Sequence, residues 1–336
     1  MALRVAINGF GRIGRLVLRA VHETMRQDIE IVAINDLGPV ETNAHLLRYD
    51  SVHSRFPGEV ASGEDWIDIG RGRIAISAER EPAKLRWQDL DIDTVFECTG
   101  KFTKRADAAR YLETGAKRVI VSAPSDGADL TVVMGVNHDE LRPSHKVISN
   151  ASCTTNCLAP VAYVLHRSIG IARGYMTTIH AYTGDQNIVD TLHRDLRRAR
   201  AAALSMIPTS TGAARSVGLV LPALKGKLDG TAIRVPTANV SLIDFKFDAA
   251  RDTSREEINT LMGEAAKSER LEGILGINTA PTVSVDFNHD PHSAVFDVTQ
   301  TQVLDRRFAR VLAWYDNEWG FSCRMLDLAA YCARLT

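Results

Sequence analysis

The chain has 336 residues, 45% hydrophobic and 24% charged, a length that favours two domains. Its formal net charge of −1 excludes the overall basic field with which proteins bind nucleic acid or anionic membranes. The five cysteines, odd in number and widely spread, do not form a disulfide framework. The N-terminus lacks a secretion-signal pattern and no apolar run reaches transmembrane length, so the expected location is the cytoplasm.

Strand and helix patterns alternate through the first half of the chain. Residues 3–8 and 29–35 form apolar runs with a helical spacing of apolar side chains between them, which together predict a βαβ unit. Further strands are predicted at 94–98, 118–122, 131–136 and 146–149, and a helix at 106–113. This alternation predicts an α/β fold in which helices cover a doubly wound parallel sheet.

The pattern changes after about residue 151. Apolar and polar side chains alternate over 243–248 and 283–288, which predicts strands of a mostly antiparallel sheet with one buried face. Helical spacing recurs at 255–268 and 321–335. We therefore expect two domains: residues 1–151, joined by a C-terminal helix at 320–336, and an α+β domain at 152–319.

A glycine-rich turn, Gly9-Phe10-Gly11-Arg12-Ile13-Gly14, lies between the first strand and its helix, and Asp36 ends the next strand. In such a turn Gly9 permits the tight bend, Gly11 lets the backbone approach a pyrophosphate, and Gly14 lets helix and strand pack closely. Glycines alone also fit an ordinary turn, but this context indicates a Rossmann-type dinucleotide site. An Asp36 carboxylate that binds ribose hydroxyls would repel a 2′-phosphate, which favours NAD; the alternative is a solvated turn residue.

The polar segment around Cys153 is a second candidate site. Apolar spacing after it predicts a helix capped by Asn150 or Ser152, so Cys153 falls in the first turn, where the helix dipole stabilises a thiolate. His180, at the end of a β-branched strand-like run, is the leading candidate for a partner base. A single cysteine is more often a small buried hydrophobe, but Ser-Cys-Thr-Thr-Asn is an unusual setting for an inert core position.

Three neighbouring features have simpler interpretations. Pro160 is expected to kink the helix that follows Cys153. Cys157 lies one turn after Cys153, but a zinc site would need more ligands than this segment supplies. We therefore predict that Cys157, like Cys98 within its strand, packs in the core.

Several groups are suited to bind anions. The arginines of 194–200 fit a solvated helix face, and we accept that interpretation for three of the four. The run Thr209-Ser210-Thr211-Gly212 is a hydroxyl-rich turn of the kind that binds phosphate. Arg234 lies in an otherwise apolar strand, where an arginine requires a charged partner, and its planar fork suits phosphate oxygens.

With these residues assembled, the sequence resembles the phosphorylating glyceraldehyde-3-phosphate dehydrogenases along essentially its whole length. The most specific block is A-S-C-T-T-N-C at 151–157. It is accompanied by I-N-G-F-G-R-I-G-R at 7–15, Y-D-S-V-H at 49–53, D-L-R-R-A-R-A-A at 195–202, R-V-P-T at 234–237 and W-Y-D-N-E-W-G at 314–320.

The resemblance implies a catalytic sequence. Cys153 would attack the aldehyde of glyceraldehyde 3-phosphate, and His180 would lower the thiol pKa and act as the base during hydride transfer to NAD. Inorganic phosphate would then attack the resulting thioester and give an acyl phosphate. The implied site for the attacking phosphate comprises Ser152, Thr154, Thr211 and Gly212. The implied groups for the substrate's own phosphate are Thr183, Arg198 and Arg234, and the assignment between the two sites stays open.

The resemblance also implies cofactor contacts and an assembly. The matching cofactor residues are Gly9, Gly11, Arg12, Ile13, Gly14, Asp36, Arg80, Thr99, Gly100, Ser122 and Asn317. No bound metal ion is expected. The family is usually a homotetramer, in which residues 182–203 would reach a neighbour's cofactor site. Three departures leave the catalytic groups intact: Phe321 replaces a common Tyr, Thr191-Leu192 replaces a Leu-Pro pair linked to strict NAD use, and Cys98 replaces Ser or Ala.

The sequence is also compatible with three other functions. Erythrose-4-phosphate dehydrogenase shares the fold, thiol and cofactor, but the turn at 209–214 resembles that of the glyceraldehyde enzyme. A nucleic-acid-binding module using the arginines of 194–200 is disfavoured by the net charge. A non-enzymatic NAD sensor is compatible with the fold alone.

Overall fold

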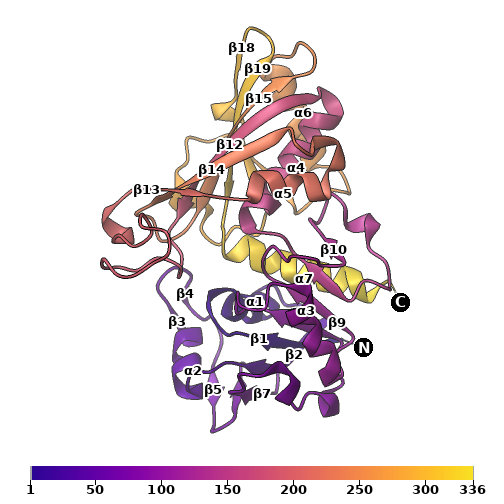
Figure 1. Ribbon diagram of the computed structural model, residues 1–336, viewed down its shortest axis with the longest axis vertical. Coiled ribbons are helices and arrows are strands. Elements are labelled where there is room, and N and C mark those ends of the chain that lie inside the picture. The colour runs from indigo at the N-terminus through magenta and orange to yellow at the C-terminus, as the bar shows by residue number, and fades with distance from the viewer. Residues whose placement is uncertain (1, 336) are drawn as a thin grey trace. The chain divides into compact units, whose positions relative to one another are not determined.

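The computed structural model describes residues 2–335 and divides into two compact units (Figure 1). Unit 1 holds the residues up to 132, then 138–152, and those from 321 onward. Unit 2 holds 133–137 and 153–320. No helix within residues 2–335 is long and apolar enough to cross a membrane.

A nine-stranded sheet forms the centre of unit 1. Its seven strands from β10 to β7 pair in parallel, whereas β6 and β5 are antiparallel additions at one edge. This is the predicted doubly wound, mainly parallel sheet. The strands, in spatial order, are β10 (Leu130–Thr131), β11 (Val147–Ser149), β9 (Arg118–Val121), β8 (Thr94–Glu97), β1 (Leu3–Asn8), β2 (Ile29–Asn35), β7 (Arg73–Ser77), β6 (Trp66–Asp68) and β5 (Ala61–Ser62).

Shorter elements complete unit 1. The hairpin of β3 (Tyr49–Asp50) and β4 (Ser54–Arg55) is separate from the main sheet. The helices are α1 (Arg12–Glu23), α2 (Val40–Arg48), α3 (Arg105–Ala108) and, from Phe321 on, α7 (Trp319–Ala333). The 3₁₀ turns are η1 (Pro82–Lys84), η2 (Gln88–Leu90), η3 (Ala109–Thr114) and η4 (His138–Glu140).

Helix α1 forms because its apolar side chains recur at helical spacing and are buried against the sheet. Arg19 is a charged residue of α1 whose side chain is buried. It is only 2% exposed, pairs with Glu23 at 2.8 Å and donates to the carbonyl oxygens of His53 and Ser54. Those three acceptors compensate the buried guanidinium and connect α1 to the hairpin loop.

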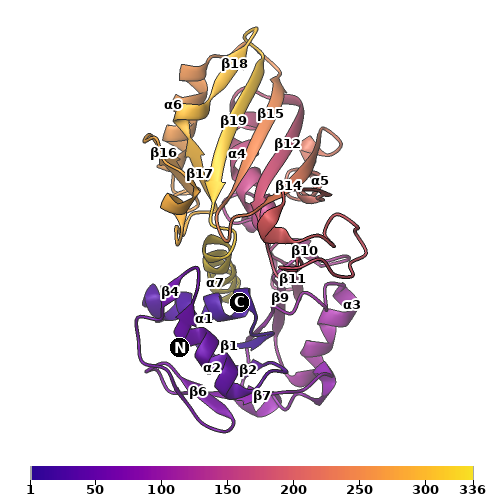
Figure 2. The ribbon, with the colours of Figure 1, turned by 90° about the vertical axis from the view of Figure 1, so that its left-hand side faces the viewer.

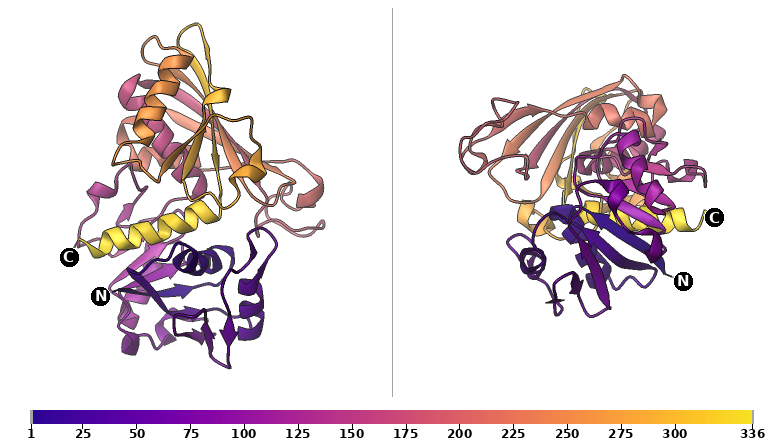
Figure 3. Two further views of the ribbon diagram at one scale, coloured as in Figure 1. Left: turned by 180° about the vertical axis from the view of Figure 1, so that it is seen from behind. Right: turned by 60° about the horizontal axis from the view of Figure 1, so that its bottom comes forward.

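Helix α7 returns the end of the chain to unit 1. Figure 3 shows it beside the N-terminal strands. Asp327 on α7 pairs with Arg26 at 2.8 Å, and Arg118 of β9 donates to the Cys332 carbonyl at 3.0 Å. These contacts attach the last helix to β9 and to the loop before β2, both more than two hundred residues earlier in the chain.

Unit 2 is built on an eight-stranded, mostly antiparallel sheet, as the sequence predicts (Figure 2). Only the pairs β12–β14 and β16–β17 are parallel. The order is β13 (Ile207–Ser210), β14 (Leu228–Val235), β12 (Ile171–Ala181), β15 (Ser241–Ala249), β19 (Phe308–Tyr315), β17 (Ala294–Asp297) and β16 (Leu275–Asn278), with β18 (Gln302–Leu304) pairing to β19.

The long helix α4 (Cys153–Ser168) contacts this sheet along β12, β15, β17 and β19, and it continues through Pro160. It also packs on α5 (Ala213–Val220) and α6 (Arg255–Ala266). Short 3₁₀ turns are η5 (Ala202–Leu204), η6 (Pro222–Leu224), η7 (Ser284–Phe287) and η8 (Val298–Gln300).

The strand predicted at 283–288 is wrong, because this segment forms the 3₁₀ turn η7. The Asp286 carboxylate accepts a hydrogen bond from the Val283 amide at 2.8 Å, so a local side-chain contact replaces strand pairing. Phe287 is buried and stacks on Trp314 at 5.2 Å between ring centroids. Val283 and Val285 are 60% and 69% exposed, so of the three alternating apolar side chains only Phe287 reaches the core.

The strand predicted at 131–136 is also shorter than expected, since β10 ends at Thr131. Gly135 has a φ of 81°, which no strand accommodates, and its carbonyl accepts from Arg270 Nε at 2.8 Å. The side chains of 133–137 thus belong to unit 2.

Gly230 of β14 is predicted to be essential for the spacing of unit 2. A methyl group there would overlap the Met176 carbonyl oxygen of β12, so Gly230→Ala should lower the free energy of unfolding by about 1–3 kcal/mol. In contrast, Gly263→Ala in α6 meets no atom within 4 Å and should raise it by about 0.5–1 kcal/mol. Urea unfolding of both variants tests this, and equal effects would contradict it.

Candidate active site

The thiol of Cys153 lies at the first residue of α4, beside the imidazole of His180. Ala151, two residues earlier, has a φ of 56°, an uncommon conformation that sets the bend into the helix. His180 is the penultimate residue of β12 and only 5% exposed. Its Nε2 is 3.5 Å from Cys153 Sγ, so the structure brings the predicted nucleophile and base into contact.

Arg234 lies on the far side of the imidazole. It is the register partner of His180 across the parallel β12–β14 pair, and its Nη1 lies 2.6 Å from His180 Nδ1. The Ala181 carbonyl oxygen is 2.7 Å from the same ring nitrogen and 2.9 Å from Arg234 Nη1. Arg234 Nη1 can only donate, so Nδ1 accepts from it in the tautomer that carries the proton on Nε2. In the other tautomer Nδ1 donates to the Ala181 carbonyl, and Nε2 presents to the thiol the lone pair that a general base needs.

Burial and the Arg234 charge lower the pKa of His180 to about 3. Burial also raises the pKa of the Cys153 thiol, although Arg234 and hydrogen bonding at Thr154 oppose that shift. Desolvation is the first cause of both shifts, because it disfavours the charged form of each group.

A tyrosine that the sequence did not single out supports both residues. The hydroxyl of Tyr315, at the end of β19, is 2.9 Å from Thr154 Oγ1 and 2.9 Å from Thr178 Oγ1. Thr154 follows the nucleophile and Thr178 precedes the histidine by two residues. The only signal of this role in the sequence is that Tyr315 lies within the block W-Y-D-N-E-W-G.

Cys157 is fully buried one turn along α4, and its Sγ makes only a weak contact of 3.9 Å with the Ala313 carbonyl. The prediction that it packs in the core is confirmed. Within residues 2–335 no three His, Cys, Asp or Glu side chains gather closely enough to hold a metal ion.

The predicted anion-binding groups of unit 2 gather near β13 and β14. Arg198 Nη1 pairs with Asp185 at 2.5 Å, and its Nε donates to Thr209 Oγ1 at 2.9 Å. The segment 194–200 is a series of turns and not the helix expected, because Asp195 accepts from the Arg197 and Arg198 amides. The rigid turn fixes one arginine and leaves its neighbours more exposed.

Four other predicted residues lie near element ends. Gly212 directly precedes α5, Thr211 accepts from the Ala213 amide at 3.2 Å, and Thr183 follows β12 with its carbonyl bonded to the Gln186 amide. Ser152 directly precedes α4. Arg234 Nε is buried without a hydrogen-bond partner among the described residues. A buried, unpaired guanidinium N–H suits an anionic ligand.

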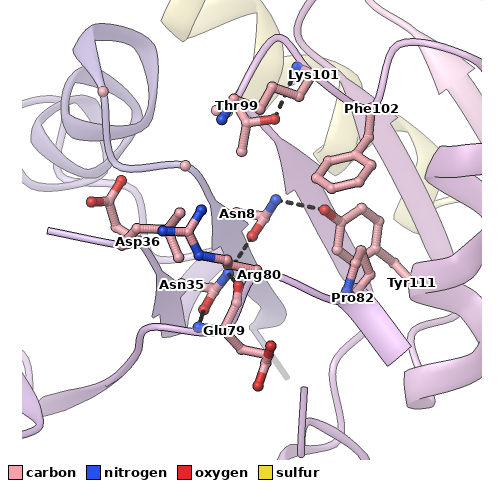
Figure 4. A pocket seen from close by; sticks show the side chains of 14 residues that line it. Asn8, Asn35, Asp36, Glu79, Arg80, Pro82, Thr99, Lys101, Phe102 and Tyr111 are labelled. Carbon is pink, nitrogen blue, oxygen red and sulfur yellow. Dashed lines mark hydrogen bonds between the residues drawn. The ribbon is translucent and has the colours of Figure 1, made fainter. Parts of the chain in front are cut away.

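Unit 1 carries a separate cavity of about 440 Å³ at the carboxyl ends of its parallel strands. Five of the predicted cofactor residues line it: Gly9, Gly11, Asp36, Arg80 and Thr99 (Figure 4). In open α/β sheets this edge is where ligands bind.

The glycines of the turn have distinct geometric reasons. Gly9 has a φ of 91°, and a methyl group on it would come within 2.7 Å of the Thr99 amide. A methyl group on Gly14 would overlap the Gly9 carbonyl oxygen. Gly11 meets no atom within 4 Å, so its backbone faces open space that a ligand can approach.

The Asp36 carboxylate is oriented by the turn itself. Its Oδ2 accepts from the Phe10 amide at 2.8 Å, and its Oδ1 accepts from the Gly38 amide at 2.9 Å. Figure 4 shows Arg80 beside it. These bonds fix the carboxylate at the end of β2, where ribose hydroxyls are bound in this fold.

The remaining predicted cofactor residues do not line the cavity: Arg12, Ile13, Gly14, Gly100, Ser122 and Asn317. Arg12 pairs with Asp50 at 2.5 Å, and together with two backbone amides it overcomes the effect of burial and lowers the pKa of Asp50 to about 2. Asn317, in unit 2, is 5% exposed and accepts from Ser241 Oγ at 2.7 Å.

Cys98 was predicted to pack in the core, and this is wrong. Strand β8 ends at Glu97, so Cys98 begins the following turn, is partly exposed, and lines the cavity. The sequence cannot reveal this, because a strand that ends one residue earlier leaves the next side chain uncovered, and strand ends are not predicted to single-residue precision.

A dinucleotide cavity on a parallel sheet, together with a cysteine–histidine pair, defines a dehydrogenase that works through a thiol. Comparison with known families agrees. Residues 3–105 match the family model described as glyceraldehyde 3-phosphate dehydrogenase, NAD binding domain, and 152–317 match its C-terminal domain. The chain belongs to the glyceraldehyde-3-phosphate dehydrogenase family and is an NAD-dependent enzyme.

Curated relatives match over the whole length. Glyceraldehyde-3-phosphate dehydrogenase of Cereibacter sphaeroides is 65% identical over 335 residues, covering 100% of both chains. The enzyme of the same name from Xanthobacter flavus is also 65% identical with the same coverage. That of Geobacillus stearothermophilus is 54% identical over 334 residues, covering 99% of each chain.

Arg234 is predicted to lower the pKa of the Cys153 thiol through its positive charge. The test replaces Arg234 in a His180→Asn background. There the imidazole is absent, so its own titration cannot affect the pH profile of the thiol. Compared with His180→Asn alone, the double variant His180→Asn/Arg234→Gln should shift the pH profile of Cys153 alkylation to higher pH. Peptide mass spectrometry of iodoacetamide labelling measures this. Arg215→Gln, an exposed site on α5, is the matched control, and an unchanged profile in the double variant would contradict the prediction.

His180 is predicted to make stability fall in acid. Its folded pKa of about 3 lies below the ordinary value, so the unfolded chain binds an extra proton as the pH falls from 6.5 toward 3. Between pH 7 and pH 5, this should cost the wild type about 2 kcal/mol that His180→Asn does not lose. Urea unfolding at both pH values tests it, with His45→Asn, an exposed histidine, as control. Equal losses in wild type and His180→Asn would refute it.

Proposed function

We propose that this protein catalyses the NAD-dependent oxidation of D-glyceraldehyde 3-phosphate, with inorganic phosphate, to 1,3-bisphosphoglycerate. The observation that carries the proposal is the 3.5 Å contact between Cys153 Sγ and His180 Nε2, with Arg234 behind the imidazole. The names of the relatives favour this substrate over erythrose 4-phosphate.

The thiol chemistry follows from that contact. His180 Nε2 accepts the thiol proton as Sγ forms a bond to the aldehyde carbon, which gives a hemithioacetal after protonation of its oxygen. NAD, when bound, supplies the hydride acceptor. His180 takes the hydroxyl proton as the hydride leaves the carbon, and a thioester remains on Cys153.

Phosphate then completes the reaction. An oxygen of inorganic phosphate attacks the thioester carbonyl, the carbon–sulfur bond breaks, and the Cys153 thiolate leaves with His180 available to return its proton. The attacking phosphate is assigned to Ser152, Thr154, Thr211 and Gly212. The phosphate of the substrate is assigned to Thr183, Arg198 and Arg234, and the unpaired Nε of Arg234 supports an anion at that point.

For the cofactor we assign the cavity of unit 1. Asp36 would accept the ribose hydroxyls, the Gly9–Gly14 turn would receive the pyrophosphate, and Arg80 and Thr99 would flank the adenosine half. Arg12, Ile13, Gly100 and Ser122 would support this cavity, and the Asn317 amide would orient the nicotinamide. Residues 1–151 with the helix at 320–336 would then be the NAD-binding domain, and 152–319 the catalytic domain.

The proposed assembly is a homotetramer in the cytoplasm. Apolar side chains on the segment 182–203 are widely exposed, with Leu192 at 99%, Leu196 at 82% and Ile188 at 79%. A second copy of the chain would cover them. All five cysteines are free, as in a reducing compartment.

Cys153→Ser tests the proposed chemistry. NADH formation from glyceraldehyde 3-phosphate should fall more than about 10³-fold, since a hydroxyl is a far weaker nucleophile, whereas NAD binding by calorimetry should stay unchanged. A non-enzymatic sensor would instead keep its behaviour in this variant.

The wild-type enzyme should require inorganic phosphate and prefer NAD to NADP. Initial rates with phosphate varied, on glyceraldehyde 3-phosphate and on erythrose 4-phosphate, measure both. Phosphate-independent oxidation that prefers the four-carbon aldehyde would overturn the proposed substrate.

A further inference from the structure

A row of polar side chains crosses the sheet of unit 1 beneath the dinucleotide cavity. It consists of the last residues of four adjacent parallel strands: Glu97 of β8, Asn8 of β1, Asn35 of β2 and Ser77 of β7. Each is the register partner of the next. Glu97, Asn8 and Asn35 are 1%, 3% and 5% exposed, so these polar groups must satisfy one another.

The hydrogen bonds of the row all run in one direction. Ser77 Oγ donates to Asn35 Oδ1 at 2.9 Å, and Asn35 Nδ2 donates to Asn8 Oδ1 at 2.7 Å. Asn8 Nδ2 in turn donates to Glu97 Oε2 at 2.8 Å. A carboxylate can only accept, so Glu97 determines which way the Asn8 amide points, and Asn8 then determines the orientation of Asn35.

Two members of the row, Glu97 and Asn35, each hold a segment of the cavity wall. Glu97 Oε1 accepts from the Thr99 amide at 2.7 Å and from the Thr99 hydroxyl. Asn35 Oδ1 accepts from the Glu79 amide at 2.8 Å, and Asn35 Nδ2 donates to the Glu79 carbonyl at 2.8 Å. Glu79 precedes Arg80, and Arg80 and Thr99 both line the cavity.

Tyr111 completes the surroundings of the carboxylate. Its hydroxyl donates to Glu97 Oε2 at 2.7 Å, and Figure 4 shows Asn8 between Asn35 and Tyr111 with a hydrogen bond to each. Burial raises the pKa of Glu97 above its ordinary value, although the bonds from Thr99, Asn8 and Tyr111 oppose that shift. The carboxylate thus has four donors converging on its two oxygens.

We propose that Glu97 is a positioning residue for the dinucleotide: through Asn8 and Asn35 its carboxylate holds the Arg80 and Thr99 segments as one preorganised unit. Glu97 does not itself line the cavity, so it acts through other residues. Segments that are ordered before binding lose less conformational entropy on binding, which strengthens affinity without a new contact. This inference rests on the proposed use of the cavity for NAD.

Glu97→Gln is the principal test, because the amide keeps the shape of the carboxylate but turns one acceptor into a donor. The new NH₂ group then faces either the Thr99 amide or the donors of Asn8 and Tyr111. Two donors cannot bond to each other, so the hydrogen bonds on that side of residue 97 are lost. The dissociation constant for NAD should rise about tenfold, the equivalent of about 1.4 kcal/mol. The kcat at saturating NAD and the KM for the aldehyde should stay within about twofold, as a positioning effect on the cofactor requires.

Glu113→Gln is the matched control, since it removes the same charge from an exposed residue of η3. Calorimetric NAD affinity in Glu97→Gln equal to that in Glu113→Gln and wild type would overturn the inference. A parallel loss of kcat and aldehyde binding would also overturn it, since that pattern indicates general structural damage.

A second measurement needs no cofactor. In the free protein, backbone amide exchange should increase in Glu97→Gln at both 78–81 and 98–102. Faster exchange at 98–102 alone would contradict coupling through Asn8 and Asn35.

The double-mutant cycle with Asn35→Ala tests whether the row acts as a unit. Each change breaks the same chain of hydrogen bonds. The double variant should therefore bind NAD about as weakly as whichever single variant has the lower NAD affinity. Additive effects would mean two independent contacts and would refute the single unit. If Glu97→Gln does not fold, Ser77→Ala, which removes only the terminal donor, should weaken NAD binding slightly, and no effect there would count against the inference.

Asp36→Asn separates this inference from the proposed function. If Asp36→Asn weakens NAD binding but Glu97→Gln and Asn35→Ala do not, the cavity is correct and the role of Glu97 is refuted. If Asp36→Asn has no effect on NAD binding, the proposed cofactor cavity itself is wrong.

Discussion

The contact between Cys153 and His180 is the interaction on which the catalytic unit depends. A thiol at the start of a helix and an imidazole near the end of a strand reach 3.5 Å only because α4 packs along the sheet that contains β12. The parallel pairing of β12 with β14 then places Arg234 opposite His180. Desolvation raises the pKa of the Cys153 thiol and lowers that of His180, whereas the Arg234 charge favours the thiolate. Binding of phosphate and transfer of a hydride lead to product only if this proton transfer first makes the sulfur nucleophilic.

The dinucleotide cavity depends on a different constraint, the close approach of backbone atoms at the carboxyl ends of parallel strands. Gly9 and Gly14 have no room for a methyl group, and Gly11 leaves its space open. Below that turn, strand-final side chains satisfy one another in a row that ends at Glu97. Turn geometry and buried polarity thus act together: the first makes space for a ligand, and the second keeps the walls in place.

The errors of sequence interpretation have physical reasons. The alternation at 283–288 does not mark a buried face, since only Phe287 is buried, and the Asp286 carboxylate bonds to the local backbone and stabilises a 3₁₀ turn. The arginines at 194–200 have no helix to occupy, because Asp195 caps a turn. Cys98 is on the cavity and not in the core, since β8 stops one residue earlier. In each case the outcome depended on a single side-chain contact or on a strand that is one residue shorter than predicted. Neither feature changes the periodicity of apolar residues along the sequence.

The sequence by itself determined the two kinds of sheet, the glycine turn with its acidic partner, and the cysteine in a polar helix start. Those features depend on local spacing and on residue chemistry, which a linear pattern records. Only the tertiary structure decided that His180 Nε2 faces Cys153, that Arg234 lies behind the imidazole, and that burial raises the pKa of the thiol. It also revealed Tyr315 and Glu97, whose roles arise from strands that are distant in the chain. Distances across a sheet and the removal of water from a site are properties of packing, and no spacing along the chain encodes them.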